Sequence, residues 1–519
     1  MNSKFTKFET TVFVLLFSLL AVFLIHNFDS IGQDIGRHLK IGEIIWQTKE
    51  VPKVNLFSFT EPDFPFTNHH WLSEVIFFNI FSLFGFSGLI LFKAFLVLAA
   101  FLLLFLAVKN LAKFWPILIS FLLSVFIFIS RTEARPEIFS FVILAFFLFA
   151  IFRAKYSNNY FYLWFLPILG LLWVNLHIYF FVGPFLMLSF LIDQAINRKN
   201  KPENVSLKKV ALILSLVFAA TLANPNGIQG ALLPFSILKE YGYSIVENQT
   251  LSFLADFFGF NLSIFVFKLS VAVAASLLVI TFRKTRQRIF EILILVFSTY
   301  AGFKMLRNLP LYAFISFPVM AILLSDVSQG IKNKLVTCAV TRRMSRVFKI
   351  AIAVFLFFMI FWVSGGGYYK ATRSSKVFGF SVPGELEKAV NFVKENKLEG
   401  PMFNNFDIGG YLIWKLYPDY KLFVDNRPEA YSVKFFSEIY KPMQESKEKW
   451  KELSEKYGIN FIFFAHTDAT PWGQTFIKSI VRDSDWKVVF INNSAIILVK
   501  NIPKNEPIFS KYKYEFIEK

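Results

Sequence analysis

Eleven long apolar segments constrain the fold of this chain more than any other feature of its sequence. A helix that crosses the hydrocarbon core of a bilayer needs about 20 mostly apolar residues. Composition agrees, since 55% of the 519 residues are hydrophobic, 69 of them are Phe, and the mean hydropathy is +0.51. The sequence therefore predicts a multi-pass α-helical membrane protein. The segments are approximately 11–28, 87–109, 114–130, 137–153, 160–175, 177–196, 208–223, 261–281, 289–303, 309–325 and 350–364.

The basic residues orient these spans. The net charge is +19, and Lys and Arg are concentrated in alternate loops. Such an excess marks cytoplasmic loops, which places the N-terminus inside and, with an odd number of spans, the C-terminus outside. No nucleic-acid-binding signature accompanies the charge, so a nucleic-acid partner is not expected. The basic segments are MNSKFTK, KNLAK, RAKYSNN, NRKNKPENVSLKK, RKTRQR and IKNKLVTCAVTRRMSRVFK.

Two further features refine the membrane part. No small-residue cleavage site follows the first apolar run, so residues 11–28 are expected to be a retained span. Residues 72–84 are also apolar, but Gly85 separates them from the next span, and we expect a helix lying at the interface. The single cysteine, Cys338, excludes a disulfide framework and a Cys-rich metal site.

The composition changes after Ser364, and a soluble domain is expected to follow. PGELEKAVNFVKEN fits an amphipathic helix, and PMFNNF, KLFVD and INFIFFA fit strands. WKVVFINNSAIILVK predicts a hairpin that turns at Asn492 and Asn493. The mixture predicts an α/β domain of normal size outside the cytoplasm. The predicted organisation is a transmembrane domain at 1–365, with its first outer loop at 28–86, a linker at 366–379 and the α/β domain at 380–519.

Unusual polar residues gather on the predicted outer face of the membrane. Five of the six histidines fall at that face or just within it, and the sixth, His466, is in the outer domain. Ionisable groups near membrane depth are costly and tend to mark functional sites, so we expect a reaction or recognition centre at the outer leaflet. The residues are Asp34, Arg37, His38, His69, His70, Glu74, Arg131, Glu133, Arg135, Asn175, His177, Asn224, Glu247, Lys304 and Arg307.

The stretch SRTEARPE, residues 130–137, has two interpretations. Helical spacing would put the guanidinium groups of Arg131 and Arg135 on one face, where they could clamp a phosphate bidentately. Alternatively, the two arginines pair with Glu133 and Glu137. The sequence favours neither.

Three other stretches also carry both a structural and a functional interpretation. FTNHHWLSE contains His69, His70 and Glu74; it fits a hydrated interfacial belt, or a histidine that binds phosphate or acts as a single ligand. Adjacent histidines point in different directions, so a metal site from that pair alone is not expected. His177 in WVNLHIYFF and the basic residues of KMLRNLP, Lys304 and Arg307, fit interfacial positions or substrate contacts.

No nucleotide-binding, G-x-S-x-G or H-E-x-x-H motif appears in a supporting context. An outward site would have no ATP. An activated substrate there is expected to arrive already charged, on a lipid carrier, and this suits many cationic groups around one carboxylate.

Several stretches resemble the GT-C superfamily, membrane glycosyltransferases that use polyprenyl-phosphate sugars. Within it, the similarity is to a bacterial branch akin to the protein mannosyltransferases. The arrangement of a first span, an outer loop that opens with an acidic residue, many further spans and an outward α/β domain is also similar. The stretches are QDIGRHLKIGEIIW, VPKVNLFSFT, FTNHHWLSEVIF, ARPEIFSF, LWVNLHIYFF, LANPNG and GGYLIWKLYPDYKLFVDNRPEAY.

The resemblance implies an inverting hexosyltransferase of the cell envelope, in the plasma membrane with its active site on the extracytoplasmic side. Partners would be a polyprenyl-phosphate-sugar donor, membrane lipids, and a glycan, lipid or protein acceptor. Asp34 would be the catalytic base. Cationic and polar groups would bind substrate and stabilise the leaving lipid phosphate. The implied substrate-binding residues are His38, His69, His70, Glu74, Arg131, Arg135, His177, Lys304 and Arg307.

One departure from the family pattern concerns its acidic pair. The matching triplet here is Gly32-Gln33-Asp34, which has one acid, and Asp29 lies five residues upstream as a substitute. A divalent cation such as Mg²⁺ or Mn²⁺ is therefore compatible with the resemblance but not required, and the metal ligands are unknown.

Two other functions stay open. A transporter or flippase usually has internal repeats and polar residues near the midplane, neither of which is evident in this sequence. A non-catalytic scaffold of the same fold is the third hypothesis, because the acidic motif is incomplete. The turn FVDNRPEAY, with Asp425, Arg427 and Glu429, either faces the membrane site or is a structural, salt-bridged turn.

Overall fold

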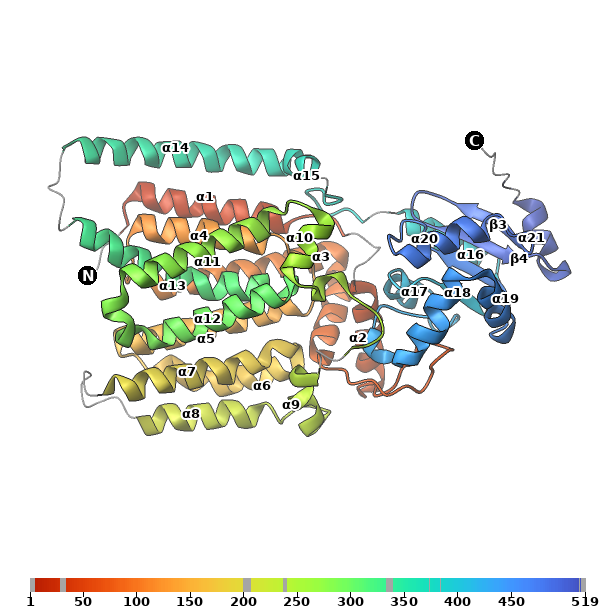
Figure 1. Ribbon diagram of the computed structural model, residues 1–519, viewed down its shortest axis with the longest axis horizontal. Helices are drawn as coiled ribbons and strands as arrows, with labels where there is room; N and C mark the ends of the chain where they lie inside the picture. The colour runs from red at the N-terminus through yellow and green to blue at the C-terminus, as the bar shows by residue number, and fades with distance from the viewer. Residues whose placement is uncertain are drawn as a thin grey trace. The chain divides into compact units, whose positions relative to one another are not determined.

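The computed structural model describes residues 5–28, 34–198, 207–236, 240–332, 339–372, 374–382, 384–512 and 514. Asp29, Gly32, Gln33 and Cys338 lie outside the described residues. The chain forms two compact units, coloured along the sequence in Figure 1. Unit 1 comprises Met1–His26, Ser87–Phe235 and Ile245–Gly379, and unit 2 comprises Asn27–Phe86, Ser236–Ser244 and Phe380–Lys519.

Unit 1 is a bundle of helices that run alongside one another, with α13 packed against α4, α11 and α12 (Figure 1). Its centre is aromatic, as where Phe314 stacks on Phe141 at a centroid distance of 5.1 Å. The helices are α1 (Lys7–Leu24), most of α3 (Trp71–Val108), α4 (Phe114–Phe128), α5 (Glu137–Ser157), α6 (Leu166–Leu176), α7 (Val182–Ile196), α8 (Leu207–Ala220), α9 (Gly227–Ser236), α10 (Leu251–Phe258), α11 (Leu262–Ile280), α12 (Ile289–Lys304), α13 (Leu309–Lys332), α14 (Ala339–Ser364) and α15 (Gly367–Ala371).

Each expected span coincides with a helix. Among the described residues, seven helices are long and apolar enough to cross a membrane, and Phe114–Phe128 and Phe161–Leu176 are shorter apolar helices. The protein is therefore helical and membrane-spanning, as the sequence predicts, whereas eleven spans with the N-terminus inside stay a prediction. The seven are Lys7–Leu24, Trp71–Val108, Glu137–Ser157, Ile178–Ile196, Leu262–Ile280, Leu306–Gln329 and Val347–Ser364.

Gly85 divides α3. Its φ of 60° and ψ of −158° are not helical, and they lie in a region that only glycine adopts readily. The part of α3 up to Phe86 belongs to unit 2, and the part from Ser87 onward belongs to unit 1. The break that the sequence predicts between the apolar stretch at 72–84 and the next span is thus confirmed.

Unit 2 is an α/β unit built on a four-stranded sheet of order β1-β2-β4-β3. β1 and β2 are parallel, and the other neighbours are antiparallel. The strands are β1 (Met402–Asn404), β2 (Phe461–Phe464), β3 (Trp486–Ile491) and β4 (Ile496–Lys500). The helices are α2 (Ile35–Thr48), the first part of α3, α16 (Glu385–Glu395), α17 (Gly409–Leu416), α18 (Lys441–Glu445), α19 (Lys447–Lys456), α20 (Pro471–Ile480) and α21 (Glu506–Lys511).

The strands at PMFNNF and INFIFFA, both strands of the hairpin and the helix at PGELEKAVNFVKEN are confirmed, but KLFVD is not a strand of the sheet. Its backbone is hydrogen-bonded elsewhere. The Leu422 N–H donates to the Phe57 carbonyl at 2.8 Å, and the Phe423 N–H donates to the Asn404 side chain at 3.0 Å. The first loop and one amide side chain thus take the place of a neighbouring strand, which local sequence does not reveal.

Helices cover both faces of the sheet, and every residue of β1 and β2 is buried. Phe461 and Phe463 pack with residues of α2, α16 and α17 on one face. Ile462 and Phe464 pack with residues of α19 and α20 on the other. The α/β class is confirmed, and the loop that contains α2 is part of the hydrophobic core of this unit.

The helices α2 and α17 cross closely at paired glycines. A β-carbon on Gly36 would lie 2.6 Å from the carbonyl oxygen of Gly410, and one on Gly410 would lie 2.9 Å from the amide nitrogen of Asn426. The absence of side chains allows this approach. It brings the first turn of α2 against the segment that follows residue 424.

Candidate functional site

Asp34 occupies the N-cap position of α2. Its Oδ1 accepts a hydrogen bond from Asn426 Nδ2 at 2.6 Å and lies 3.4 Å from Arg37 Nη2. The side chain is 23% exposed, so an acceptor can reach it. A carboxylate oriented by an amide and a guanidinium, yet accessible, has the properties of a positioned base.

The turn that holds Asn426 is anchored from within. Arg427 is 1% exposed and donates to Asp425 from Nε at 2.8 Å and from Nη2 at 2.7 Å. Nη2 also donates to Asn55 Oδ1 at 2.7 Å. The structural, salt-bridged interpretation of this turn is therefore confirmed. The intervening residue, Asn426, contacts Asp34 instead.

Sequence reasoning assigned no role to Asn426. The alternation of side chains along the chain could have identified Asn426. In an extended segment successive side chains point to opposite sides, so a residue between two inward-pointing side chains points outward.

Arg37 is a second residue without an assigned role. It is 5% exposed, and its Nε and Nη1 have no hydrogen-bond partner within the described part of the chain. The pKa values of two carboxyls in this unit are shifted. Burial raises the pKa of Glu429, and Arg37 opposes that rise. Burial raises the pKa of Asp407 to about 6, and the negative charges of Asp468 and Asp34 contribute.

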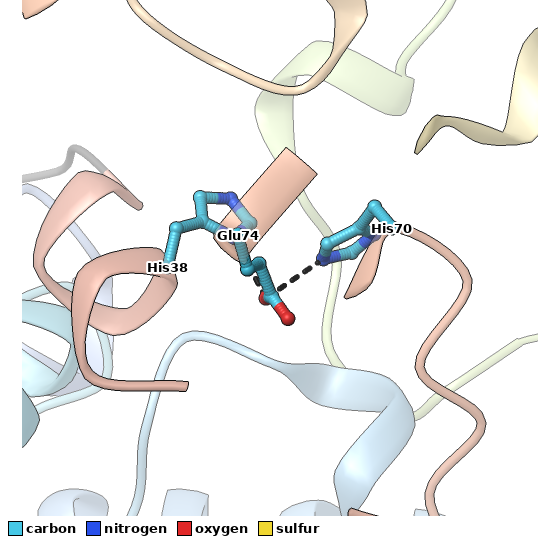
Figure 2. Close-up of side chains that lie close together, drawn as sticks. All are labelled: His38, His70 and Glu74. Atoms are coloured by element: carbon cyan, nitrogen blue, oxygen red, sulfur yellow. Dashed lines mark hydrogen bonds and ion pairs between the residues drawn. The ribbon is translucent and has the colours of Figure 1, made fainter. Parts of the chain in front are cut away.

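His38, His70 and Glu74 form a buried group in unit 2. Figure 2 shows the Glu74 carboxylate directed toward both imidazoles. Its Oε1 lies 2.9 Å from His38 Nδ1 and 3.4 Å from His70 Nε2. Asn68 Nδ2 donates to the other oxygen, Oε2, at 2.6 Å. Burial, and then the charge of Arg37, lower the pKa of His38 to about 4, while the hydrogen bond to Glu74 opposes this.

Three of the predicted substrate-binding residues thus come together. The two histidines that converge are His38 and His70, not the adjacent pair. His69 packs edge-on against His70 at a centroid distance of 4.2 Å. This agrees with the expectation that neighbouring histidines point in different directions.

In unit 1, Arg131 and Arg135 share one carboxylate. Arg131 Nη1 lies 2.6 Å from Glu247 Oε1, and Arg135 Nη1 lies 2.7 Å from Oε2. Arg131 also pairs with Glu137 through Nε and Nη2, at 3.2 and 3.1 Å. Burial raises the pKa of Glu247, but Arg131 and Arg135 lower it to about 2.

The predicted ion pair with Glu137 is therefore observed, and Arg131 forms it. Glu133 instead pairs with Lys376, whose Nζ lies 2.6 Å from Glu133 Oε1. The phosphate clamp stays a prediction. Arg307 adds a further positive charge that acts on Glu247, and its Nη1 donates to Asn248 at 3.1 Å.

His177 and Lys304 have other surroundings. His177 Nδ1 is 2.8 Å from Ser140 Oγ, which also accepts from the indole of Trp173 at 2.7 Å. Lys304 is exposed, and its ammonium lies 5.5 Å from the ring centre of Tyr300. Their proposed contacts with substrate stay predictions.

Comparison with known proteins gives matches of structure only. No family model matches the sequence, and no curated protein matches it. The structure is similar to that of the archaeal oligosaccharyltransferase AglB from Archaeoglobus fulgidus in complex with an inhibitory peptide and a dolichol-phosphate. The TM-score is 0.61 at 12% identity, over 96% of this chain and 75% of that one.

The chain has the GT-C fold.

Two further structures of the Archaeoglobus fulgidus enzyme are similar. One is tethered to an acceptor peptide and has a TM-score of 0.60, at 13% identity over 95% of this chain and 74% of that one. The other is a complex with Zn and sulfate and has a TM-score of 0.50, with the same identity and coverage. The GT-C fold that the short motifs imply is thus confirmed.

Proposed function

We propose that the protein is an extracytoplasmic membrane glycosyltransferase that moves a sugar from a polyprenyl-phosphate donor to a hydroxyl acceptor, with Asp34 as general base. The observation that carries this proposal is the accessible Asp34 carboxylate, which Asn426 and Arg37 orient at the start of α2. The GT-C fold supports it, because AglB is an oligosaccharyltransferase whose structures contain dolichol-phosphate or an acceptor peptide.

The proposed reaction is a single inverting displacement. Asp34 removes the proton of the acceptor hydroxyl as its oxygen attacks the anomeric carbon of the sugar. The bond from that carbon to the phosphate oxygen breaks, and its electron pair leaves on the polyprenyl phosphate. Asn426 keeps the carboxylate in one orientation, which matters because small misplacements of a base are costly.

Within unit 1, we propose that Arg135 and Arg307 bind a phosphate. Arg131 is held on both sides by carboxylates and serves to position Glu247. Arg307 keeps a buried Nε that has no hydrogen-bond partner in the described ranges. A guanidinium N–H of this kind suits a phosphate oxygen.

No step of this mechanism passes through Mg²⁺ or Mn²⁺ at Asp34. One oxygen of this carboxylate, Oδ1, accepts from an amide N–H and lies 3.4 Å from a guanidinium nitrogen. Hard cations prefer several oxygen ligands and are repelled by a neighbouring positive charge. Among the described residues, the donors around Oδ1 therefore do not fit them.

The test uses the full chain purified in detergent and a panel of radiolabelled polyprenyl-phosphate sugars, with transfer to glycan, lipid and peptide acceptors measured. Asp34→Asn should lower transfer by about 100-fold or more, the usual contribution of a general base. Asp63→Asn, the same change at an exposed loop carboxylate, should leave transfer unchanged. Equal rates in Asp34→Asn and the unmodified protein would refute the assignment of the base. Absence of transfer from every donor would refute the proposed function.

A further inference from the structure

The buried group of His38, His70 and Glu74 has the ligands of a transition-metal site. We propose that these three side chains bind one Zn²⁺ ion, which ties α2 to the beginning of α3. The proposal is independent of the glycosyltransferase reaction and assigns these residues to a metal rather than to the sugar or its phosphate.

The geometry fits an ion without rearrangement of the backbone. One ligand atom from each of the three residues lies within 4.8 Å of the others. Ligands about 2.0–2.1 Å from a tetrahedral Zn²⁺ are separated from one another by roughly 3.3 Å. The separations of 2.9 and 3.4 Å from Glu74 Oε1 to the two imidazole nitrogens bracket that value. Small side-chain rotations would therefore admit the ion.

The chemistry of the ligands selects the metal. Two imidazoles and one carboxylate suit Zn²⁺, whereas Mg²⁺ and Ca²⁺ prefer oxygen ligands alone. The three residues are between 0 and 5% exposed, so they are buried away from bulk solvent. The fourth position of a tetrahedral ion would take water, as in other sites with three protein ligands.

Asn68 acts on two of the ligands. Its Nδ2 donates to Glu74 Oε2 at 2.6 Å, and its Oδ1 accepts from the backbone N–H of His70 at 3.1 Å. These contacts direct Oε1, the remaining carboxylate oxygen, toward the imidazoles. Partners of this kind orient metal ligands and raise affinity for the ion.

The charge of Glu74 also favours a cation. Its side chain is 0% exposed, and no Lys or Arg forms an ion pair with it in the part of the chain that the structure describes. A fully buried carboxylate whose partners are imidazoles and an amide is costly. A divalent ion between the three ligands would offset that cost.

The ion would hold the helix that carries the proposed base. His38 lies one turn after Asp34 on α2, and its N–H donates to the Asp34 carbonyl at 3.1 Å. Residues 70–74 are at the beginning of α3. The bound metal would thus be a positioning element for the first turn of α2, and it takes no part in bond breaking.

The experiment measures metal directly. The full chain is purified in detergent, stripped with a chelator, incubated with Zn²⁺ and desalted, and its zinc content is determined by mass spectrometry. We expect about one equivalent per chain in the unmodified protein and less than a tenth of that in His38→Gln, His70→Gln and Glu74→Gln. His466→Gln, a histidine in the same unit that is outside the group, should retain the full equivalent.

Two further measurements separate metal binding from misfolding. Asn68→Ala keeps all three ligands and should weaken zinc binding by about 10- to 100-fold in a competition titration with a chromophoric chelator. Zn²⁺ should also raise the unfolding temperature of the unmodified protein but not that of His38→Gln.

Failure of the stripped, folded protein to take up zinc would overturn the proposal, as would equal zinc content in Glu74→Gln and the unmodified protein. Because metal content is measured without sugar transfer, a failed Asp34 assignment would leave this result unaffected.

Discussion

Replacing Arg427 with Met tests whether a buried ion pair holds the turn that presents Asn426 to Asp34. The guanidinium makes three hydrogen bonds, two to Asp425 and one to Asn55. It also lies over the ring of Phe57, 4.9 Å from its centre. Met has a similar length and fills much of the same space, so the change removes the charge and the donors more than the packing.

The expected cost follows from the burial of the partner. Asp425 is 0% exposed, and without Arg427 its charge would be buried without a cation. Removing one member of a buried ion pair typically costs about 3–5 kcal/mol of unfolding free energy. At about 2–4 °C per kcal/mol for a domain of this size, the unfolding temperature should fall by roughly 6–20 °C. Neutralising both members, in Asp425→Asn with Arg427→Met, should cost at least about 1–2 kcal/mol less than Arg427→Met alone.

The assay is thermal unfolding of the full chain in detergent, followed by tryptophan fluorescence. Six of the ten tryptophans lie in unit 2, so this probe reports mainly on the unit that contains the turn. Lys388→Met is the matched control, because Lys388 pairs with Glu385 on the surface and its side chain is 66% exposed. Exposed pairs contribute little, and the control should not shift the transition measurably.

Two outcomes would refute the reasoning. An unfolding temperature for Arg427→Met within 2 °C of the unmodified protein would mean that the pair does not stabilise the turn. A double variant less stable than Arg427→Met would mean that the cost does not come from an unpaired buried charge.

Three other changes are predictable from the same unit. Asn426→Ala removes a charge-assisted hydrogen bond of about 1.5–3 kcal/mol, so sugar transfer should fall about 10- to 150-fold with little change in unfolding temperature; an unchanged rate would show that Asp34 needs no amide partner. Asp407→Asn should stabilise the protein at pH 7.5 but not at pH 4. Because the folded-state pKa of Asp407 is raised to about 6, the free energy of unfolding of the unmodified protein falls as the pH rises from about 4 to 6 and stays lower at higher pH. Unfolding temperatures that change with pH in the same way in Asp407→Asn and in the unmodified protein would contradict this. Gly42→Ala places a β-carbon against the backbone carbonyl of Glu74, so it should cost about 1–3 kcal/mol in chemical denaturation and lower transfer, and a variant as stable and active as the parent would disprove the close crossing of α2 and α3.

The helices and most strands were predictable because their signals are local. The length and hydropathy of each apolar segment indicate a span wherever they occur. The hairpin at residues 486–500 was predictable because Asn492 accepts hydrogen bonds from the two N–H groups that close its own turn, at 3.0 and 2.9 Å. KLFVD has the composition of a strand, but its hydrogen-bond partners are Phe57, far away in the chain, and the side chain of Asn404.

The candidate site was predictable only in part. Asp34, His38, His70 and Glu74 stood out as ionisable groups beside an apolar span, and the motif resemblance drew attention to Asp34. Asn426 did not stand out, since it lies 392 residues from Asp34 in sequence and an uncharged amide in a turn is common.

The sequence by itself determined that this chain is a helical membrane protein with an α/β portion, because burying long apolar segments leaves few alternatives. Tertiary structure alone decided which polar groups meet. The glycine contact between α2 and α17 brings Asn426 to Asp34, and the packing of α2 against α3 brings His38 to Glu74. Distances of a few ångströms between side chains decide whether a carboxylate is a base, a metal ligand or half of an ion pair, and only the folded backbone sets those distances.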